Sequence, residues 1–315
     1  MPNFQGVWDL RTQFQYAGEW PEPFPTDLGL FAGGITVANI DFVSISSTGN
    51  ATDFGDLTQA RYNLVGLGSS ARGVFAGGQG STFDIIDFVT FASTGDASDF
   101  GNLTVASYSK GGLSNNTRGL FIAGSNASGT LLATIDYITI ASEGNASDFG
   151  DTTVAKQKAD GFASTTRGVY GGGTVSGTIN VIEYVTIGST GNGTDFGDLT
   201  VARADPATFS SSTRGIFAGG DSSGGGTANE VIDYVTIASA GNATDFGDLL
   251  SATRDAAGCS SKTRGLIGGG YQTGGTTVIQ YVTIASTGNA TDFGDLTGSG
   301  KANFAACSNV HGGIS

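Results

Sequence analysis

The stretch "GNATDFGDLT" occupies residues 49–58 and returns letter for letter at residues 288–297. Four close variants lie between these two copies, at residues 95–104, 145–154, 191–200 and 241–250. The first Asp of each copy follows the previous one by 46, 49, 47, 50 and 47 residues. A period of this length is typical of solenoids and β-propellers. The chain is therefore expected to consist of six similar units.

Each unit contains four candidate β-strands. In the fifth unit these are "ADPATFSSS", "GIFAGG", "VIDYVTIAS" and "TDFGDLL", at residues 204–212, 215–220, 231–239 and 244–250. Along the third strand Ile232 and Tyr234 point to one side and Val235 to the other, so the strand is apolar on both faces. Such a strand is covered on both faces, as it is when sheets stack radially. No long segment has apolar residues at helical spacing, and we expect an all-β fold.

The spacing inside the units predicts where they vary. The third-strand Ile precedes the first Asp of the phrase by 13 residues in all six units, and that Asp precedes an "RG" position by 19 residues. All variation in length falls between the second and third strands, in residues 35–39, 79–85, 125–134, 174–181, 221–231 and 271–278. In an antiparallel blade these variable loops lie at one end, opposite the turns of constant length.

The two ends of the repeat indicate a closed ring. The first unit begins at residue 27 with its second strand, and residues 302–315 align with a first strand and its turn. A C-terminal strand that completes the N-terminal sheet removes the open edges of the array. We therefore expect a six-bladed β-propeller of four-stranded blades over residues 27–315. The expected blades are about residues 27–61 with 302–315, then 62–107, 108–156, 157–203, 204–254 and 255–301.

Two stretches carry a resemblance to known proteins. The segment "RGIFAGG" (214–220) and its equivalents, followed by an aromatic strand, resemble the kelch repeat over residues 27–315. Kelch blades usually carry a Trp on the fourth strand, where this chain has Phe54 and its equivalents. The phrases "TGNATDFGDLT" (48–58) and "GVWDLRTQFQYAGEWP" (6–21) resemble repeated virion-associated structural proteins of marine tailed bacteriophages. That second resemblance implies a place, the phage particle, and no defined chemistry.

The repeated phrase has two interpretations. As a hairpin turn, its Asn and Gly take the positive φ of a tight turn, while Ser, Thr and Asp cap backbone amides and the Phe packs between blades. As a Ca²⁺ loop, it would use oxygens such as those of Asn50, Asp53 and Asp56. The spacing lacks the alternating acidic ladder and closing Glu of an EF-hand, so the turn is favoured. We expect no cofactor.

The "RG" positions also have two interpretations. Each Arg either hydrogen-bonds carbonyls of the next blade and stacks on an aromatic ring, or joins a ring of guanidinium groups that binds an anion. The set is Arg72, Arg118, Arg167, Arg214, Arg264 and, in the last unit, His311. His311 has no second base partner, and the sequence holds no nucleophile triad, Cys/His metal cluster or phosphate-binding loop. We expect a protein that is not an enzyme.

The composition restricts partners and compartment. The formal net charge of −14 argues against a nucleic-acid partner. No stretch is apolar enough to span a membrane, and the N-terminus lacks the apolar core of a signal peptide. Cys259 and Cys307 are too few for a disulfide framework, so we expect small buried or free thiols. These features fit a protein made in a reducing cytosol.

Two regions are candidates for binding. The Gly-, Ser-, Thr- and Asn-rich variable loops suit contact with a glycan or protein, and unconstrained drift would produce similar loops. Their candidate recognition residues are Phe83, Asn126, Asn180, Asp221, Asn229 and Tyr271. The N-terminal segment, residues 1–26, is aromatic-rich, unlike a flexible tail. It is expected to dock on a neighbouring protein through Trp8, Phe14, Tyr16, Trp20 and Phe24, and the alternative is packing on its own propeller.

Together these features favour a non-enzymatic structural protein of the virion, made in the host cytoplasm, in a head decoration or the tail. It would be attached to other virion proteins by the N-terminal segment and would present the variable loops to a host glycan or protein. One alternative is a free carbohydrate- or protein-binding propeller. Another is a hydrolase with a pocket in the central channel.

Overall fold

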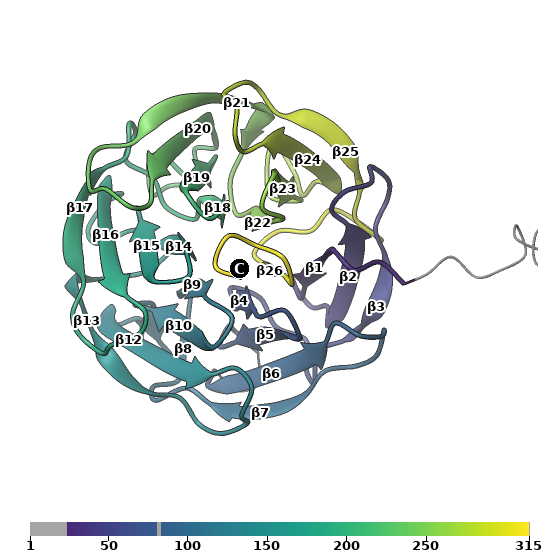
Figure 1. The fold of residues 1–315 in the computed structure, drawn as a ribbon, viewed down its shortest axis with the longest axis horizontal. Helices are drawn as coiled ribbons and strands as arrows, with labels where there is room; N and C mark the ends of the chain where they lie inside the picture. Colours follow the sequence, from purple (N-terminus) through teal and green to yellow (C-terminus); the bar gives the residue numbers. More distant parts are fainter. Residues whose placement is uncertain (1–23, 81–82, 315) are drawn as a thin grey trace, which may run out of the picture.

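The computed structural model describes residues 24–80 and 83–314. In this part of the chain, six four-stranded antiparallel sheets surround one axis, and no segment forms a helix (Figure 1). No helix that could cross a membrane is therefore found among these residues. The molecule is a six-bladed β-propeller, which confirms the fold expected from the repeat.

Each blade is a simple meander whose first strand lies nearest the axis. Blade 1 is β26 (Ala305–Ser308), β1 (Leu28–Ala32), β2 (Asn39–Ser44) and β3 (Thr52–Asp56); blade 2 is β4 (Val65–Gly68), β5 (Arg72–Ala76), β6 (Ile85–Thr90) and β7 (Ser98–Asn102); blade 3 is β9 (Gly111–Ser114), β10 (Arg118–Ile122), β12 (Leu132–Thr139) and β13 (Ser147–Lys156); blade 4 is β14 (Asp160–Ala163), β15 (Arg167–Gly171), β16 (Val181–Thr186) and β17 (Thr194–Asp198); blade 5 is β18 (Ala207–Ser210), β19 (Arg214–Ala218), β20 (Asn229–Thr236) and β21 (Thr244–Thr253); blade 6 is β22 (Ala257–Ser260), β23 (Arg264–Gly268), β24 (Val278–Thr283) and β25 (Thr291–Asp295). The short strands β8 (Ser107–Tyr108) and β11 (Ser125–Asn126) pair beside blade 3.

The ring closes within blade 1, where β26 pairs antiparallel with β1 and places Cys307 opposite Leu30. Just beyond β26, the side chain of Asn309 ties the two ends of the propeller together. Its Oδ1 accepts the backbone N–H of Leu28 at 2.8 Å, and its Nδ2 donates to the carbonyl of Thr26 at 2.9 Å. The expected completion of the N-terminal sheet by a C-terminal strand is thus confirmed.

The core consists of six apolar layers, one between each pair of neighbouring blades. Between blades 1 and 2, Phe54 of β3 packs with Val89 and Phe91 from blade 2. The equivalent Phe of every unit is nearly fully buried: Phe54, Phe100, Phe149, Phe196, Phe246 and Phe293. Blades can approach this closely because small residues face large ones; a Cβ at Gly265 would lie 1.9 Å from the ring of Phe209. The expectation that the phrase's Phe packs between blades is confirmed.

The repeated phrase forms a clasp between neighbouring blades. In blade 1, the backbone N–H groups of Gly49 and Ala51 donate to the carbonyls of Phe293 and Asp295 on β25, at 2.8 and 2.7 Å. In return, the backbone N–H of Asp295 donates to Oδ1 of Asn50 at 3.1 Å. Equivalent bonds join every pair of neighbours, with Asp96, Asn145, Asn192, Asn242 and Asn289 in the role of Asn50. Six copies of the phrase therefore make a continuous belt around the rim.

The positive φ expected for the Asn and Gly that open the phrase lies elsewhere in most copies. It occurs at the second Gly in all six units, with φ of 147–151° at Gly55, Gly101, Gly150, Gly197, Gly247 and Gly294. The leading Gly has positive φ only at Gly144 and Gly288, and none of the Asn has it. The next blade also requires glycine at this position, because a Cβ on Gly294 would lie 2.3 Å from the carbonyl oxygen of Gly49.

In five of the six blades, a buried ion pair anchors the segment that enters the blade to that blade's third strand. In blade 2, Nη1 of Arg61 lies 2.9 Å from Oδ2 of Asp87, and neither side chain is exposed to solvent. The same arrangement joins Lys110 to Asp136, Lys156 to Glu183, Arg203 to Asp233 and Lys301 to Asp41. Blade 6 has neutral Gln280 and Thr253 at these two places, and Gln280 accepts the N–H of Leu250 at 2.8 Å. Acid and base are thus both present or both absent in every blade.

Candidate functional site

The blades give the propeller two unlike faces. Turns between first and second strands, such as residues 211–213, and between third and fourth strands, such as residues 237–243, form the fixed-turn face. Loops between second and third strands, such as residues 219–228, and the connections between blades form the variable-loop face. Because each blade is antiparallel, these two sets lie at opposite ends of the strands.

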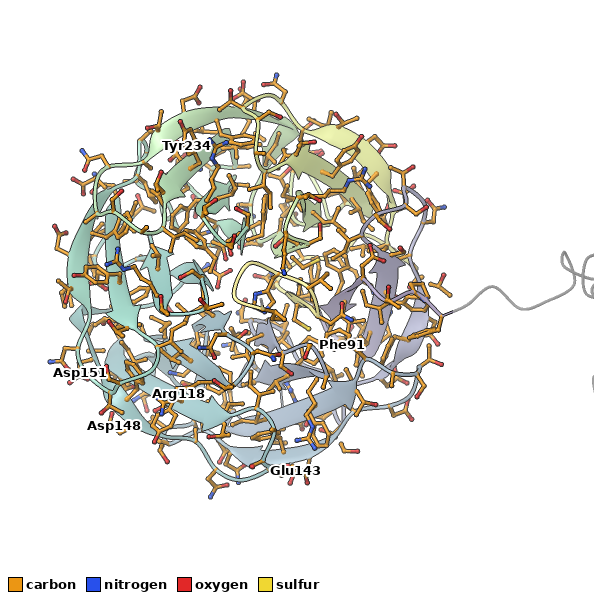
Figure 2. The ribbon with its side chains drawn as sticks, viewed as in Figure 1. Phe91, Arg118, Glu143, Asp148, Asp151 and Tyr234 are labelled. Atoms are coloured by element: carbon orange, nitrogen blue, oxygen red, sulfur yellow. The ribbon has the colours of Figure 1, made fainter. Side chains whose placement is uncertain are left out.

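On the fixed-turn face, the guanidinium groups of the "RG" series are already engaged. That of Arg214 lies 4.3 Å from the ring centroid of Tyr234 in its own blade and donates to the carbonyl of Ile284 in the next blade at 2.9 Å. Arg72, Arg118, Arg167 and Arg264 make the same two contacts. We call these five stacked Arg side chains the Arg ladder. Figure 2 labels Arg118 of this ladder, Tyr234, on which Arg214 stacks, and Asp148 and Asp151 on the outer rim. The series therefore braces neighbouring blades.

The C-terminal tail lies across the axis on the same face (Figure 1). Nε2 of His311 lies 3.0 Å from the carbonyl oxygen of Gly68, and Nδ1 accepts the backbone N–H of Gly313 at 3.1 Å. These bonds define a neutral ring that carries its proton on Nε2. Burial lowers the pKa of His311 to about 4, although the bond to Gly68 opposes the shift. His311 therefore anchors the tail over the channel instead of bracing two blades as the Arg ladder does.

The channel beneath the tail is narrow. Serine hydroxyls link the inner strands directly; Ser114 donates to Gly68 at 2.7 Å, and Ser308 donates to Ser260 at 2.6 Å. The cavities at its two ends measure about 50 and about 80 Å³. Pockets for small organic ligands usually measure about 300–1,000 Å³. Each end of the channel therefore has room for little more than water. Cys259 and Cys307, on adjacent inner strands, are free and buried, as expected.

The channel mouth on the variable-loop face is polar. Six residues with positive φ, one ahead of each inner strand, surround it: Asn63, Ser109, Lys158, Asp205, Asp255 and Asn303. A chain of backbone hydrogen bonds of 2.7–3.1 Å runs between neighbours from Asp255 through Asn303, Asn63, Ser109 and Lys158 to Asp205. These bonds fix the rim of the mouth and explain why non-glycine residues persist in a left-handed conformation there.

Two carboxyl groups at this mouth, those of Asp160 and Asp205, have raised pKa values. Burial raises the pKa of Asp160 to about 6, against hydrogen bonds from the N–H of Gly112 and the hydroxyl of Thr208. Burial and the neighbouring Asp255 raise the pKa of Asp205 to about 7, although Nζ of Lys158 lies 2.6 Å from its Oδ2. In the described part of the chain, no group of three or more His, Cys, Asp or Glu side chains is arranged to hold a metal ion.

The oxygens of the alternative Ca²⁺ loop are spread over the rim. Oδ1 of Asn50 already accepts a backbone N–H, while Asp53 and Asp56 are exposed along the outer strand β3. The phrase's structural partners are thus the atoms of the preceding blade.

Three of the six predicted recognition residues order their own loops. Asn126 caps the N–H groups of Ser128 and Thr130. Asp221 accepts those of Ser223, Gly226 and Thr227. These hydrogen bonds lower its pKa although burial opposes them. Asn229 accepts the N–H of Val231.

The other three have different surroundings. Asn180 is exposed, and Phe83 is half-buried with its ring centroid 6.0 Å from that of Tyr108. Tyr271 is 39% exposed and has the guanidinium of Arg254 at 4.6 Å from its ring centroid. The six predicted residues come from five different blades and do not form one cluster.

Tyr271 borders a sizeable hollow. A groove of about 370 Å³ lies between the variable loops of blades 6 and 1. We call it the seam groove; it is lined by Gly34, Ile35, Val37, Asn39, Tyr271, Gly275 and residues 297–302. Ile35 and Val37 lie in a predicted variable loop, but the sequence did not single them out as recognition residues. The two walls are distant in the sequence, so no local pattern could bring them together.

The N-terminal segment enters the propeller on the fixed-turn face. Asp27 accepts the hydroxyl of Ser44 at 2.8 Å and the N–H of Ser46 at 2.7 Å, beside the turn that follows β2. Phe24 packs on its own propeller, with its ring centroid 5.6 Å from that of Phe42. Trp8, Phe14, Tyr16 and Trp20 lie outside the described residues.

Comparison of the chain with protein-family models and with curated proteins gives no match.

Proposed function

We propose that this propeller is a non-enzymatic structural protein of a bacteriophage virion, in a head decoration or the tail. It would dock by Trp8, Phe14, Tyr16 and Trp20 of its N-terminal segment and present the variable-loop face outward. The observation that carries the proposal is the opposition of the two faces: the chain enters at Phe24 and Asp27 on the fixed-turn face, and every variable loop lies on the other. A protein attached by its N-terminal segment would then point its variable loops away from the attachment.

The charge distribution supports this class of function. Among the Lys and Arg of the described residues, five lie in the buried ion pairs, five in the Arg ladder and two, Lys158 and Arg254, in ion pairs at the channel mouth. Lys262 alone among them makes none of these contacts. The outer strands meanwhile expose Asp53, Asp148 and their equivalents. An acidic surface favours solubility and disfavours nucleic acid as a partner.

The small cavities of the channel favour a scaffold over a hydrolase with a central pocket. The resemblances to kelch repeats and to virion proteins of marine tailed phages support the finer assignment. A free carbohydrate- or protein-binding propeller is the second candidate, and the seam groove favours it.

Peptide mass spectrometry and antibody-labelled electron microscopy of washed particles of the encoding phage test the proposal. The expected result is abundant protein with label at one fixed position on head or tail. A particle free of the protein after washing would refute the virion role and favour the free binding propeller.

A second experiment tests the attachment. A variant with Trp8, Phe14, Tyr16 and Trp20 all replaced by Ser is expected to fold and to be missing from particles. A matched control with Gln13 and Gln15 replaced by Ala is expected to assemble normally. Normal assembly of the aromatic variant would refute docking through this segment.

A further inference from the structure

The seam groove concentrates the exposed apolar surface of the propeller. Five large apolar side chains of the described residues are exposed: Ile35, Val37, Val154, Leu250 and Tyr271. Ile35, Val37 and Tyr271 all border this one groove, and they are 58%, 36% and 39% exposed. Apolar side chains gathered in a hollow are typical of a binding site, whereas single ones scattered on a surface are ordinary.

One wall of the groove is held in a costly backbone conformation. Thr36, between the two aliphatic side chains, has a φ of 63° and is the only β-branched residue among the non-glycine residues of positive φ in the described chain. Such a conformation is a genuine outlier for a β-branched side chain. The turn is closed by a bond of 3.3 Å from the N–H of Val37 to the carbonyl of Gly34. Strain of this kind gathers at ligand-binding positions.

The opposite wall is a braced aromatic ring. The backbones of Tyr271 and Arg254 exchange hydrogen bonds of 2.7 and 3.1 Å. The guanidinium of Arg254 lies over the ring and is itself paired with Asp255. Tyr271 is therefore fixed before any ligand arrives, which reduces the entropy lost on binding.

The floor between the walls offers neutral polar groups. The only ionisable side chain on it, that of Lys301, places Nζ 2.5 Å from the buried carboxylate of Asp41. Nδ2 of Asn39 donates to Asp41 at 2.9 Å, and the hydroxyl of Thr297 donates to the same carboxylate. The hydroxyl of Ser299 and the backbone of residues 298–300 complete the floor. With every charge paired and a net charge of −14 on the chain, the groove suits an uncharged ligand.

We propose that the seam groove binds one neutral sugar residue of a glycan, with a C–H face of the sugar against Tyr271 and its hydroxyl groups on the floor. A volume of about 370 Å³ is close to the lower end for ligand pockets. A protein partner would need an interface of about 1,000 Å² or more with buried anchors, and the surrounding Gly- and Ser-rich loops provide few. The inference rests on the proposed function in taking the variable-loop face as the recognising face.

Saturation-transfer NMR on the full-length protein tests this proposal with the methyl glycosides of glucose, galactose, mannose and N-acetylglucosamine. The methyl glycoside of sialic acid serves as an anionic control. We expect saturation of the ring protons of at least one neutral glycoside and none of the sialoside. Absence of transfer to all four neutral glycosides, or equal transfer to the sialoside, would overturn the proposal.

Variants assign any binding to the groove. Tyr271→Ala is expected to weaken binding about tenfold or more, while Tyr271→Phe keeps it. Leu250→Ala, which truncates an exposed apolar side chain outside the groove, serves as the matched control, and circular dichroism checks that every variant is folded. Binding unchanged in Tyr271→Ala would refute the groove as the site. The particle analysis and the binding assay are independent. A failure of sugar binding would not refute the virion role, and absence of the protein from particles would not refute sugar binding in the groove.

Discussion

The ion pair between Arg61 and Asp87 can be replaced by the neutral pair that blade 6 already uses. The perturbation is a cycle of three variants: Asp87→Gln, Arg61→Thr, and both together, which copies Gln280 and Thr253. A longer side chain fits the acid's position, because blade 4 carries Glu183 there. The cycle therefore asks whether the two opposite charges are needed at this place or whether two neutral polar side chains suffice.

The expected magnitudes follow from burial. Both side chains of the pair are fully buried, Nη2 of Arg61 also donates to the carbonyl of Phe75 at 3.1 Å, and Asp87 accepts the hydroxyl of Thr58 at 2.7 Å. Each single variant leaves one buried charge without its partner, at a cost of about 3–5 kcal/mol in the free energy of unfolding. The double variant removes both charges and is expected to cost about 2 kcal/mol or less. The coupling energy is then about 4 kcal/mol or more.

Urea denaturation followed by circular dichroism, at one pH for all four proteins, measures these differences. Repeating the series at high salt should leave the coupling unchanged, because a buried pair is little screened. Single effects that add up to the double effect to within about 0.5 kcal/mol would refute the coupling. A double variant as unstable as the worse single one would refute the equivalence of the charged and neutral solutions.

Three further predictions concern the clasp, the tail and the channel mouth. Gly294→Ala should destabilise the protein by about 2–4 kcal/mol in urea denaturation, because its φ is 151° and a Cβ would meet the carbonyl of Gly49 at 2.3 Å. Gly49→Ala, with open space around the new methyl group, should stay within about 0.5 kcal/mol, and equal effects would refute the clasp. The folded-state pKa of His311, about 4, lies below its ordinary 6.5, so the unfolded chain binds the proton first as the pH falls. The free energy of unfolding should therefore decrease by up to ~3 kcal/mol between about pH 6.5 and pH 4. His311→Gln should remove that loss, and an unaltered stability profile would contradict it. Asp160 has a folded-state pKa of about 6, above its ordinary 3.8, so the native protein loses up to ~3 kcal/mol as the pH rises from about 4 to 6. Asp160→Asn should gain stability relative to the native protein over that window, and a constant difference between the two would contradict this.

The fold was predictable because its period and its internal spacing are both visible in the sequence. Constant distances from Ile232 to Asp245, and between the equivalent residues of every unit, required the same strands and turns six times. The alignment of residues 302–315 with a first strand predicted closure for the same reason. Such signals are local or periodic, and they need no knowledge of which atoms meet.

The interactions between units were not predictable in the same way. Asn50 looked like part of a tight turn, because its true partner, the backbone of Asp295, belongs to another copy of the phrase. The buried pairs left a weaker signal: an acid or Gln follows the third-strand Ile, and a base or Thr follows the phrase. Reading that signal needs the pairing geometry, since the base at Lys110 is displaced along the chain from the equivalent of Arg61.

The closure of β26 on β1 changes how the molecule can come apart. In an open array of repeats the terminal units have one neighbour each and fray first. Here every blade has two neighbours, and even the blade made from the two ends of the propeller is covered on both sides. No blade can leave without breaking two interfaces at once, so none of the six is an open end of the array. Amide protons of the inner strands should consequently exchange at similar rates around the whole ring.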